Sequence, residues 1–497
     1  MDIVVDTSLF VKRLETVATA ELTEDFSLPE YQPPIQRVVG VKATPLLEGK
    51  YLSGEELELD GCVTYTILYM GEDGSLTQTS QTTSYTASVP VKSEDDRFSA
   101  RDMVVGYTVE GVNCRVTGPR KFTLSSRVKH NVMSQKPMDV GLKVEKRDGM
   151  TASPVLRRQN ETHTTASVCE VSKNCEISGE MREREGMKLV MAQGSVAISD
   201  VRIGGQNKKE ALVKGECFVN VLLCSPEGEY VLSKGRAPIE ETVELPEAAS
   251  FSAFAAAFGN VAMIEIESGE GGEVRWNVEY DIDCTLMRTL ECETAADAYL
   301  TGTDSTLTYG EFVSYAPACV KNGRLTTSGT GRMRPGAKFI CAWGSGTADR
   351  CDISGGKMTV HGSVKVSLVT LFEGEMLTDE ITLPLKYECE AVPGARDAAD
   401  GDISRRVAVS VTDIGVRPDG DVANITVELS LSAVALETQQ VNAVVGITPV
   451  MGSTNVEEQK RNVIRVYVPE KDETPWDVEK RFRLGREIFP EGDKYVI

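Results

Sequence analysis

Few residues of this chain have the types and spacing that catalysis requires. The three histidines, His130, His163 and His361, lie far apart in the sequence, in strand-like or linker-like settings. A general base or a zinc site needs an imidazole held beside further charged or ligating groups. We therefore expect these histidines to be ordinary surface or core residues.

A glycine-rich stretch, GRMRPGAK (331–338), has two glycines at the spacing of a phosphate-binding loop. Ala337, however, separates Gly336 from Lys338. Phe339 then stands where a Mg²⁺-binding Ser or Thr would follow. The sequence also lacks the G-x-S-x-G, H-E-x-x-H and EF-hand patterns. It thus predicts a non-enzymatic protein without cofactor or metal, and an enzyme hidden in the β-domains is the weaker alternative.

The twelve cysteines are scattered, with no C-x-x-C pair among them. In a reducing compartment, scattered cysteines usually behave as small buried hydrophobes. We expect that behaviour here and little metal or redox chemistry.

Charge and hydropathy exclude several classes of function. The formal net charge of −22 disfavours nucleic acid and anionic membrane surfaces as partners, and it allows docking onto a basic protein surface. No apolar run approaches the roughly 20 residues of a membrane-spanning helix, so we expect no membrane insertion. The start of the chain, MDIVVDTSLFVKRLE, lacks the features of a secretory signal. We expect a cytoplasmic protein.

Most of the strands that the sequence predicts belong to an internal repeat. Residues 57–76, 211–230 and 358–376 align with one another. Each copy has one glycine inside a long alternating run and a second glycine in the turn that ends the run. The first set is Gly61, Gly215 and Gly362, and the second is Gly74, Gly228 and Gly374. A glycine inside a strand indicates a bulge or a close backbone approach.

The repeat extends in both directions and has the length of a domain. The strand-like segments 37–43, 188–194 and 338–344 precede the three runs, and pairs of strand-like segments joined by glycine-rich turns follow them. In each run one face is apolar, as a half-buried strand requires. We therefore predict a mainly β protein with three tandem β-sandwich or partly open barrel domains.

We place the domain boundaries at three polar stretches, near 147–165, 294–306 and 448–462. Helix is expected only in small pieces, such as 249–258. The predicted organisation is three β-domains and a tail: 1–148, 149–300, 301–447, a linker at 448–463 and a small C-terminal domain at 464–497.

The tail is predicted to form a small βααβ-like unit. A strand at 464–470 leads into a helix whose N-cap is Thr474, and Asp477 lies in the first turn, where the helix dipole favours negative charge. The strand 493–497 closes the unit. Val478 and Phe482 lie four residues apart and share one face of the helix.

Trp476 lies two residues before Val478. Two interpretations of Trp476, Val478 and Phe482 are compatible with each other. Trp476, Val478 and Phe482 could form the core that lets so short a segment fold, or they could bind a partner. We predict a partner-binding face made of Thr474, Trp476, Asp477, Val478 and Phe482.

These residues resemble two known families. The run from Asp472 to Glu479 looks like the helix start of a LysM module, and the terminal GDKYVI resembles the closing strand of that family. The segment FSLPEYQPPIQRVVGVKA, with Leu28, Pro29 and Ile35, resembles SPOCS domains of spore-forming Firmicutes. Three SPOCS domains followed by a short, divergent C-terminal LysM is the organisation of SipL-like spore coat morphogenetic proteins.

The resemblance implies a non-enzymatic scaffold made in the mother-cell cytoplasm that acts at the forespore surface. Such proteins link the coat to a basement-layer ATPase and other coat proteins, partly through the LysM module. Here, however, only about nine residues separate Leu484 from Lys494, so much of the usual sugar-binding loop is missing. Docking onto a protein is therefore the expected role, and binding of peptidoglycan or a chitin-type glycan is the alternative.

Overall fold

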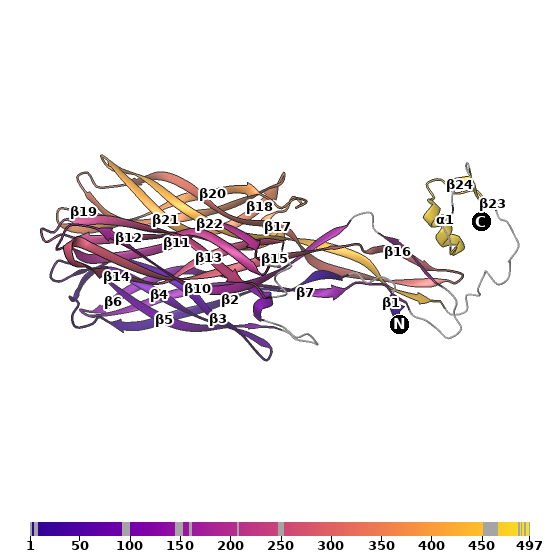
Figure 1. The fold of residues 1–497 in the computed structure, drawn as a ribbon, viewed down its shortest axis with the longest axis horizontal. Coiled ribbons are helices and arrows are strands. Elements are labelled where there is room, and N and C mark those ends of the chain that lie inside the picture. The colour runs from indigo at the N-terminus through magenta and orange to yellow at the C-terminus, as the bar shows by residue number, and fades with distance from the viewer. Residues whose placement is uncertain are drawn as a thin grey trace.

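The computed structural model shows a mainly β protein (Figure 1). It describes residues 2–3, 8–91, 100–144, 153–158, 162–205, 208–246, 253–450, 466–485, 488, 490–491 and 494–496. Within these residues the only α-helix is α1 (Pro475–Phe482), and the 3-10 helices are η1 (Ala100–Asp102), η4 (Glu270–Gly272) and η5 (Asp400–Asp402). None of the helices in this part of the chain has the length and apolar character needed to cross a membrane.

The first β-unit consists of two antiparallel sheets that enclose a core. One sheet has the order β2-β7-β6 and the other β3-β4-β5. The strands are β2 (Ser8–Ser27), β3 (Ile35–Ser53), β4 (Glu56–Gly71), β5 (Leu76–Pro90), β6 (Met103–Gly118) and β7 (Lys121–Asp139). Leu22, Tyr65 and Phe122 from the two sheets are buried together, because alternate residues of each strand point inward.

The second and third β-units repeat this strand order. Their sheets are β10-β15-β14 with β11-β12-β13, and β17-β22-β21 with β18-β19-β20. The second unit contains β10 (His163–Arg182), β11 (Lys188–Gly204), β12 (Glu210–Cys224), β13 (Tyr230–Glu244), β14 (Phe254–Ser268) and β15 (Glu273–Cys292). The third contains β17 (Ser305–Arg332), β18 (Lys338–Ser354), β19 (Lys357–Phe372), β20 (Glu375–Glu390), β21 (Ile403–Asp419) and β22 (Val422–Pro449). The sandwich-like, mainly β prediction is therefore confirmed.

The repeat glycines have the roles that the sequence predicts. A Cβ added at Gly61, Gly215 or Gly362 would overlap a main-chain carbonyl oxygen of the adjacent strand, and a register shift follows the residue opposite each glycine. Only glycine allows the two backbones to approach so closely. The turn glycines Gly74, Gly228 and Gly374 have φ of 79°, 84° and 83°, a left-handed conformation that other residues rarely adopt.

The three units meet around a common hydrophobic core, to which each contributes equivalent residues. The third residues of the segments 37–43, 188–194 and 338–344 lie in it, and so do the residues seven positions after each repeat glycine. They are Val39, Val190 and Ile340, and Leu68, Leu222 and Val369. The units are thus arranged with approximate three-fold symmetry, and together they form the elongated body in Figure 1.

A narrow stalk extends from one end of this body (Figure 1). It contains β1 (Asp2–Ile3), β8 (Lys143–Val144), β9 (Pro154–Arg158), β16 (Ala295–Leu300), the start of β17 and the end of β22. β9 and β16 pair with each other, and Ala298, Val444 and Ile447 are buried between the stalk strands. The two 28-residue strands β17 and β22 run through both the third unit and the stalk, so they connect the two parts directly.

Two of the polar stretches predicted as linkers therefore contain strands. The stretch 147–165 includes β9, and 294–306 includes β16. Their prediction as linkers was wrong because each strand is short, and its few apolar side chains, such as Ala298 and Leu300 of β16, are buried only through contact with strands distant in sequence. The boundary at 300/301 falls in the turn after β16, whereas 447/448 falls inside β22. The boundary at 148/149 and residues 451–463 of the predicted linker lie outside the described residues.

The predicted helix at 249–258 was also wrong where the structure describes it. Phe254 begins β14, which pairs along its length with β15. Alanine favours helix locally, but tertiary packing overrides that preference. Ala256 and Phe258 are buried against Tyr315 and Val434 of the third unit, and the small alanine side chain permits this close approach between units.

The C-terminal unit lies at the far end of the stalk (Figure 1). Its sheet has the order β23-β25-β24, formed by β23 (Val466–Tyr467), β24 (Pro490–Glu491) and β25 (Lys494–Val496). Within the described residues the unit has one helix, α1, and the second helix of the predicted βααβ-like pattern stays a prediction. Arg483 takes a left-handed φ of 54° and ends α1, and Pro490 belongs to a strand. Arg486 and Phe489, in the predicted turn, lie outside the described residues.

Candidate interaction sites

The start of α1 has the cap that the sequence predicts. The Thr474 hydroxyl accepts a hydrogen bond from the Asp477 amide at 3.4 Å, and the Asp477 carboxylate accepts one from the Thr474 amide at 2.8 Å. This reciprocal pair satisfies amides that a helix start leaves without partners. The hydrogen bonds from Thr474 lower the pKa of Asp477. Thr474 and Asp477 are exposed, but their polar groups are used within the cap.

Val478 and Phe482 form the small core of the C-terminal unit. Val478 is fully buried beside Ile488 and Tyr495. The ring of Phe482 contacts that of Tyr467 edge-on, with 5.1 Å between centroids. Val478 therefore lies inside the unit and not on a surface, so its assignment to a partner-binding face is corrected. Burial of these few side chains is what allows so short a segment to fold.

Trp476 contacts the stalk. Its indole N–H donates a hydrogen bond to Asp297 at 2.9 Å, and its ring lies 5.3 Å from that of Tyr299. Asp297 and Tyr299 belong to β16. The Lys480 ammonium, one turn further along α1, binds both oxygens of Asp297 at 2.6 and 2.7 Å. The Asp297 carboxylate thus accepts hydrogen bonds from one neutral and one charged donor, and both donors lie on the same face of α1.

Further contacts surround this carboxylate. The Tyr299 hydroxyl donates to the Leu484 carbonyl at 2.6 Å, and Arg483 forms an ion pair with Asp304. Burial raises the pKa of Asp297, but the hydrogen bonds from Lys480 and Trp476 outweigh it, so the pKa lies below the usual value. Asp297 is therefore ionised at neutral pH, and the contact is charge-assisted.

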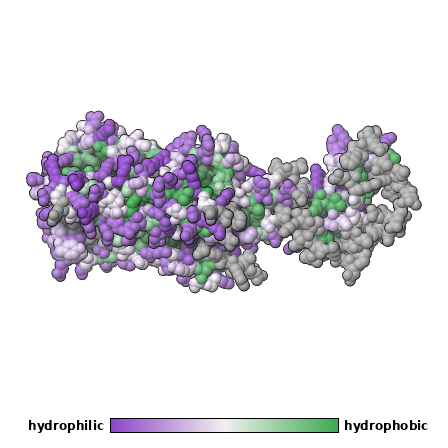
Figure 2. Space-filling view, viewed as in Figure 1, coloured by the Kyte–Doolittle hydropathy of each residue, from purple (hydrophilic) through white to green (hydrophobic). Residues whose placement is uncertain are grey.

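The C-terminal unit also has an exposed apolar edge on β23. Tyr467 points into the small core, so its neighbours Val466 and Val468 point the opposite way along the extended chain. Their side chains are 61% and 58% exposed. By comparison, the face of the body seen in Figure 2 is largely hydrophilic, with hydrophobic residues in small separate groups. Exposed apolar residues of this kind favour contact with another protein surface.

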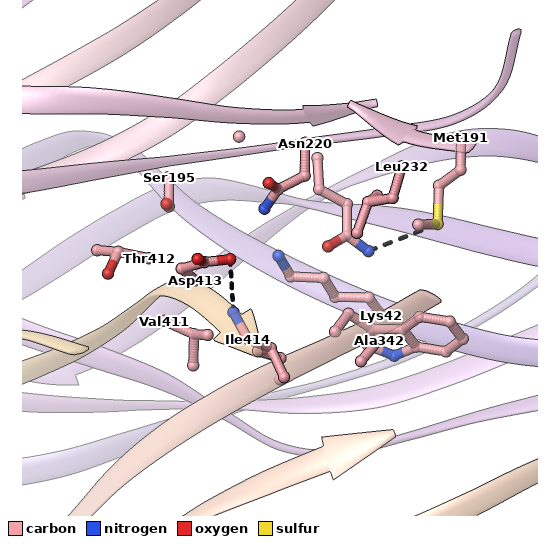
Figure 3. A pocket seen from close by; sticks show the side chains of 14 residues that line it. Lys42, Met191, Ser195, Asn220, Leu232, Ala342, Val411, Thr412, Asp413 and Ile414 are labelled. Carbon is pink, nitrogen blue, oxygen red and sulfur yellow. Dashed lines mark hydrogen bonds between the residues drawn. The ribbon is translucent and has the colours of Figure 1, made fainter. Parts of the chain in front are cut away.

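A second candidate site is a pocket where the three β-units meet (Figure 3). The sixth residues of the equivalent segments 37–43, 188–194 and 338–344 all line it: Lys42, Gln193 and Trp343. The repeat therefore places a cation, an amide and an indole at the same position in its three copies. Ser195, Asn220, Thr412 and Asp413 complete the polar part of the lining.

Figure 3 shows the Lys42 side chain extending into this pocket toward Asp413. Burial lowers the pKa of Lys42, because the surrounding protein disfavours the charged form. Asp413 accepts a hydrogen bond from the Ile414 amide at 2.8 Å and forms an ion pair with Lys234. An ammonium beside amide groups can hold water or a small anion, so this pocket suits binding more than catalysis.

A buried charge cluster lies elsewhere at the junction of the units. Arg406 of the third unit forms ion pairs with Glu170 and Asp283 of the second, the latter at 2.8 Å. Lys50 of the first unit binds Glu170 at 2.8 Å. The Arg406 guanidinium also lies 4.0 Å from the centroid of the Phe258 ring. Two cations and two anions from three units thus neutralise one another in a largely buried site, where Lys50 and Asp283 keep 15% and 13% of their side chains exposed.

Burial shifts the pKa values of this cluster without changing its charges at neutral pH. It lowers the pKa of Lys50 to about 8 and that of Arg406 to about 10, and it raises the pKa of Asp283 to about 6. Within the described residues, no group of three or more His, Cys, Asp or Glu side chains is placed to hold a metal ion. The cluster joins side chains of all three units.

The structure places the three histidines in strands and the glycine-rich stretch mostly in a turn. His130 is buried in the first unit, and its Nε2 lies 3.0 Å from the Tyr85 hydroxyl. Residues 333–337 form the turn between β17 and β18. His163 begins β10, and the His361 ring is 3.4 Å from Asp352.

Sequence reasoning missed both the junction and the stalk contact. One signal for the junction exists: Leu68, Leu222 and Val369 each lie between residues of the inward face, so the strands are apolar on both sides there. For the stalk contact there is no such signal, because Trp476 and Asp297 are 179 residues apart.

Comparison with known proteins adds no relative. No family model matches the chain, and neither do any of the curated proteins or solved structures.

Proposed function

We propose that this chain is a non-enzymatic scaffold of the spore coat, in which three SPOCS-like units and a short LysM-like unit tether coat proteins to the forespore surface. One observation carries the proposal: the C-terminal unit is held at the far end of a stalk that continues the strands of a three-unit body. This arrangement presents a small folded unit at a fixed distance from a large surface, which suits a tether between two partners.

The structure changes which residues of the C-terminal unit are available to a partner. Trp476 and Lys480 are used to orient the unit on β16. Val466 and Val468 remain exposed. We infer that the β23 edge docks onto the coat-anchoring ATPase, while Trp476 positions the unit and does not itself contact the partner. The open edge of β23 offers main-chain groups for strand addition by such a protein.

The use of Trp476 also bears on the alternative function. A glycan-binding module needs aromatic and polar side chains that are open to the sugar, whereas the Trp476 indole is engaged by Tyr299 and Asp297. This supports a protein partner over peptidoglycan or a chitin-type glycan.

The test is binding of the purified full chain to the coat-anchoring ATPase. We expect the double variant Val466→Asp, Val468→Asp to weaken binding at least tenfold, as deletion of residues 464–497 does. Tyr31→Asp, which places one new negative charge on a body side chain that is 85% exposed, is the control and should bind normally. Unchanged binding of the deletion variant would overturn the proposal.

A parallel assay measures co-sedimentation with purified peptidoglycan. Retention of the full chain but not of the deletion variant would favour the glycan-binding alternative and contradict protein docking. Absence of retention, together with ATPase binding, supports the scaffold.

A further inference from the structure

Two cysteines of the third unit lie close enough to react with each other. The sulfur atoms of Cys319 and Cys389 are 3.4 Å apart, although the residues are separated by 70 positions in the chain. Cys319 is on β17 and Cys389 on β20, so they come from the two different sheets of the unit. Cys319 is fully buried, and Cys389 is 8% exposed.

The main chain at this place already holds the two strands together. The Val392 amide, just after β20, donates a hydrogen bond to the Ala318 carbonyl at 2.8 Å. The adjoining Cys319 sulfur lies 3.9 Å from the Glu390 carbonyl oxygen. A disulfide needs sulfur atoms about 2.05 Å apart and α-carbons within about 7 Å. The main-chain contact places the two strands side by side here, and the sulfur atoms are already 3.4 Å apart.

The ionisation of the pair gives the two thiols different roles. The hydrogen bond from Cys319 lowers the pKa of Cys389 against the opposing effect of burial, and that same bond raises the pKa of Cys319. Cys389 is also the more exposed residue of the two, and its lowered pKa favours the thiolate form that an attacking nucleophile needs. Cys319 keeps its proton and is placed to react second.

The other two copies lack this pair. The cross-strand partners of the repeat glycines are Tyr85, Ile239 and Leu385, and the residues four positions further on are Val89, Val243 and Cys389. Cys319 also has an equivalent in the first copy. Leu14 is the first paired residue after the register shift in β2, just as Cys319 is the first paired residue after a register shift in β17. Valine and leucine fill the same inward positions in the first copy, so packing alone does not require two thiols in the third.

We propose that Cys319 and Cys389 are a site of oxidative cross-linking, at which a small peroxide converts the two thiols to a disulfide that joins the sheets of the third unit. The Cys389 thiolate attacks one peroxide oxygen, the O–O bond breaks, and the departing hydroxide takes a proton to become water. The Cys319 sulfur then attacks the sulfenic sulfur of Cys389. The S–S bond forms, the S–O bond breaks, and the released hydroxide leaves as water with the Cys319 proton.

In total, two thiols lose two electrons and two protons, and one hydrogen peroxide becomes two waters. The bond would close a loop of 70 residues and tie β20 to β17, one of the two strands that continue into the stalk. Such a cross-link restricts the unfolded chain and slows separation of the sheets. The proposal does not depend on the proposed function.

The test treats the purified full chain with hydrogen peroxide, followed by alkylation and non-reducing peptide mass spectrometry. We expect a Cys319–Cys389 linked peptide and a melting temperature higher by roughly 5–10 °C, reversed by dithiothreitol. Cys389→Val, which installs the residue of the other copies, should abolish both effects. Cys351→Ala, in the same buried cluster, should leave both unchanged.

A labelling experiment checks the order of the two steps. In Cys319→Val, a dimedone-type reagent should trap sulfenic acid at Cys389, whereas Cys389→Val should show little label at Cys319. Both thiols remaining free to alkylate after peroxide would overturn the proposal, as would linked peptides spread among many of the twelve cysteines.

Discussion

The junction of the three β-units and the contact between the C-terminal unit and the stalk use the same chemistry in different surroundings. Each joins parts that are distant in sequence by pairing basic side chains with carboxylates. At the junction, Arg406 is 4% exposed and its partner Glu170 is 3% exposed. At the stalk, Lys480 is 40% exposed and Asp297 is 23% exposed.

The difference determines how firmly each part is held. A buried charge that loses its partner has no water to replace it, so the junction cannot open without a large loss of stability. A half-exposed pair can exchange its partner for water at little cost. The body is therefore expected to unfold as one assembly, whereas the C-terminal unit is expected to detach while the body stays folded.

The largest effect is expected from Arg406→Met, which removes the ion-pair partner of Asp283 and leaves Glu170 with Lys50 alone. The free energy of unfolding, measured by urea denaturation, should fall by about 3–5 kcal/mol. Lys214→Ala removes an exposed pair with Glu240 and is the matched control, with a change below about 1 kcal/mol. Equal losses in the two variants would show that burial does not distinguish them.

An intermediate effect is expected on acidification of the body. Burial lowers the pKa of His130 to about 4, from an ordinary value of about 6.5. The unfolded chain therefore binds the proton first, so this contribution to stability is complete above pH 6.5 and is lost as pH falls toward 4. The loss amounts to about 3 kcal/mol.

The measurement compares urea unfolding of the wild type and His130→Gln at pH 7.5 and 4.5. The variant keeps a polar partner for Tyr85 but does not titrate, so its loss of stability between the two pH values should be smaller. The same pH dependence in both proteins would assign the effect to other groups.

The smallest effect on global stability is expected from Asp297→Asn. It removes the charge that Lys480 and Trp476 both contact, and the stalk contact should weaken by about 1–2 kcal/mol. Hydrogen exchange at residues 295–300 and 475–482 should speed up, while exchange in the body strands stays the same. Faster exchange throughout the body would contradict the separation of the two regions.

The stalk contact should also resist acid better than the body does. The pKa of Asp297 lies below its usual value, so its stabilising contribution is present above about pH 3.8 and is lost only as pH falls through the lower folded value. Between pH 6.5 and 4 the body should lose stability through His130 while exchange at residues 475–482 remains slow.

The structural features that depend on neighbouring residues along the chain could be predicted from the sequence. The alternating runs, the repeat glycines and the cap of Thr474 on α1 are local patterns, and the structure has them where predicted. The segment 249–258 shows the limit of such patterns. Its alanines 255–257 favour helix locally, but they lie in a strand that packs against another unit.

Contacts between distant parts could not be predicted in this way. Nothing in one copy of the repeat specifies the face through which it meets the other two. The apolar runs around Leu68, Leu222 and Val369 carry part of that information, since half-buried strands rarely need two apolar faces. The pairing of Cys319 with Cys389 depends on how the two sheets stack, which the spacing of the cysteines does not reveal.

The pocket between the units has a further consequence. In a homotrimer, a residue near the symmetry axis occurs three times, so a lysine there would bring three ammonium groups together. Within one chain the three copies mutate independently, and Lys42 faces Gln193 and Trp343 at the matching positions. Because the three copies belong to one chain, this centre can hold a single lysine. In an assembly of identical subunits, three ammonium groups would meet there and repel one another.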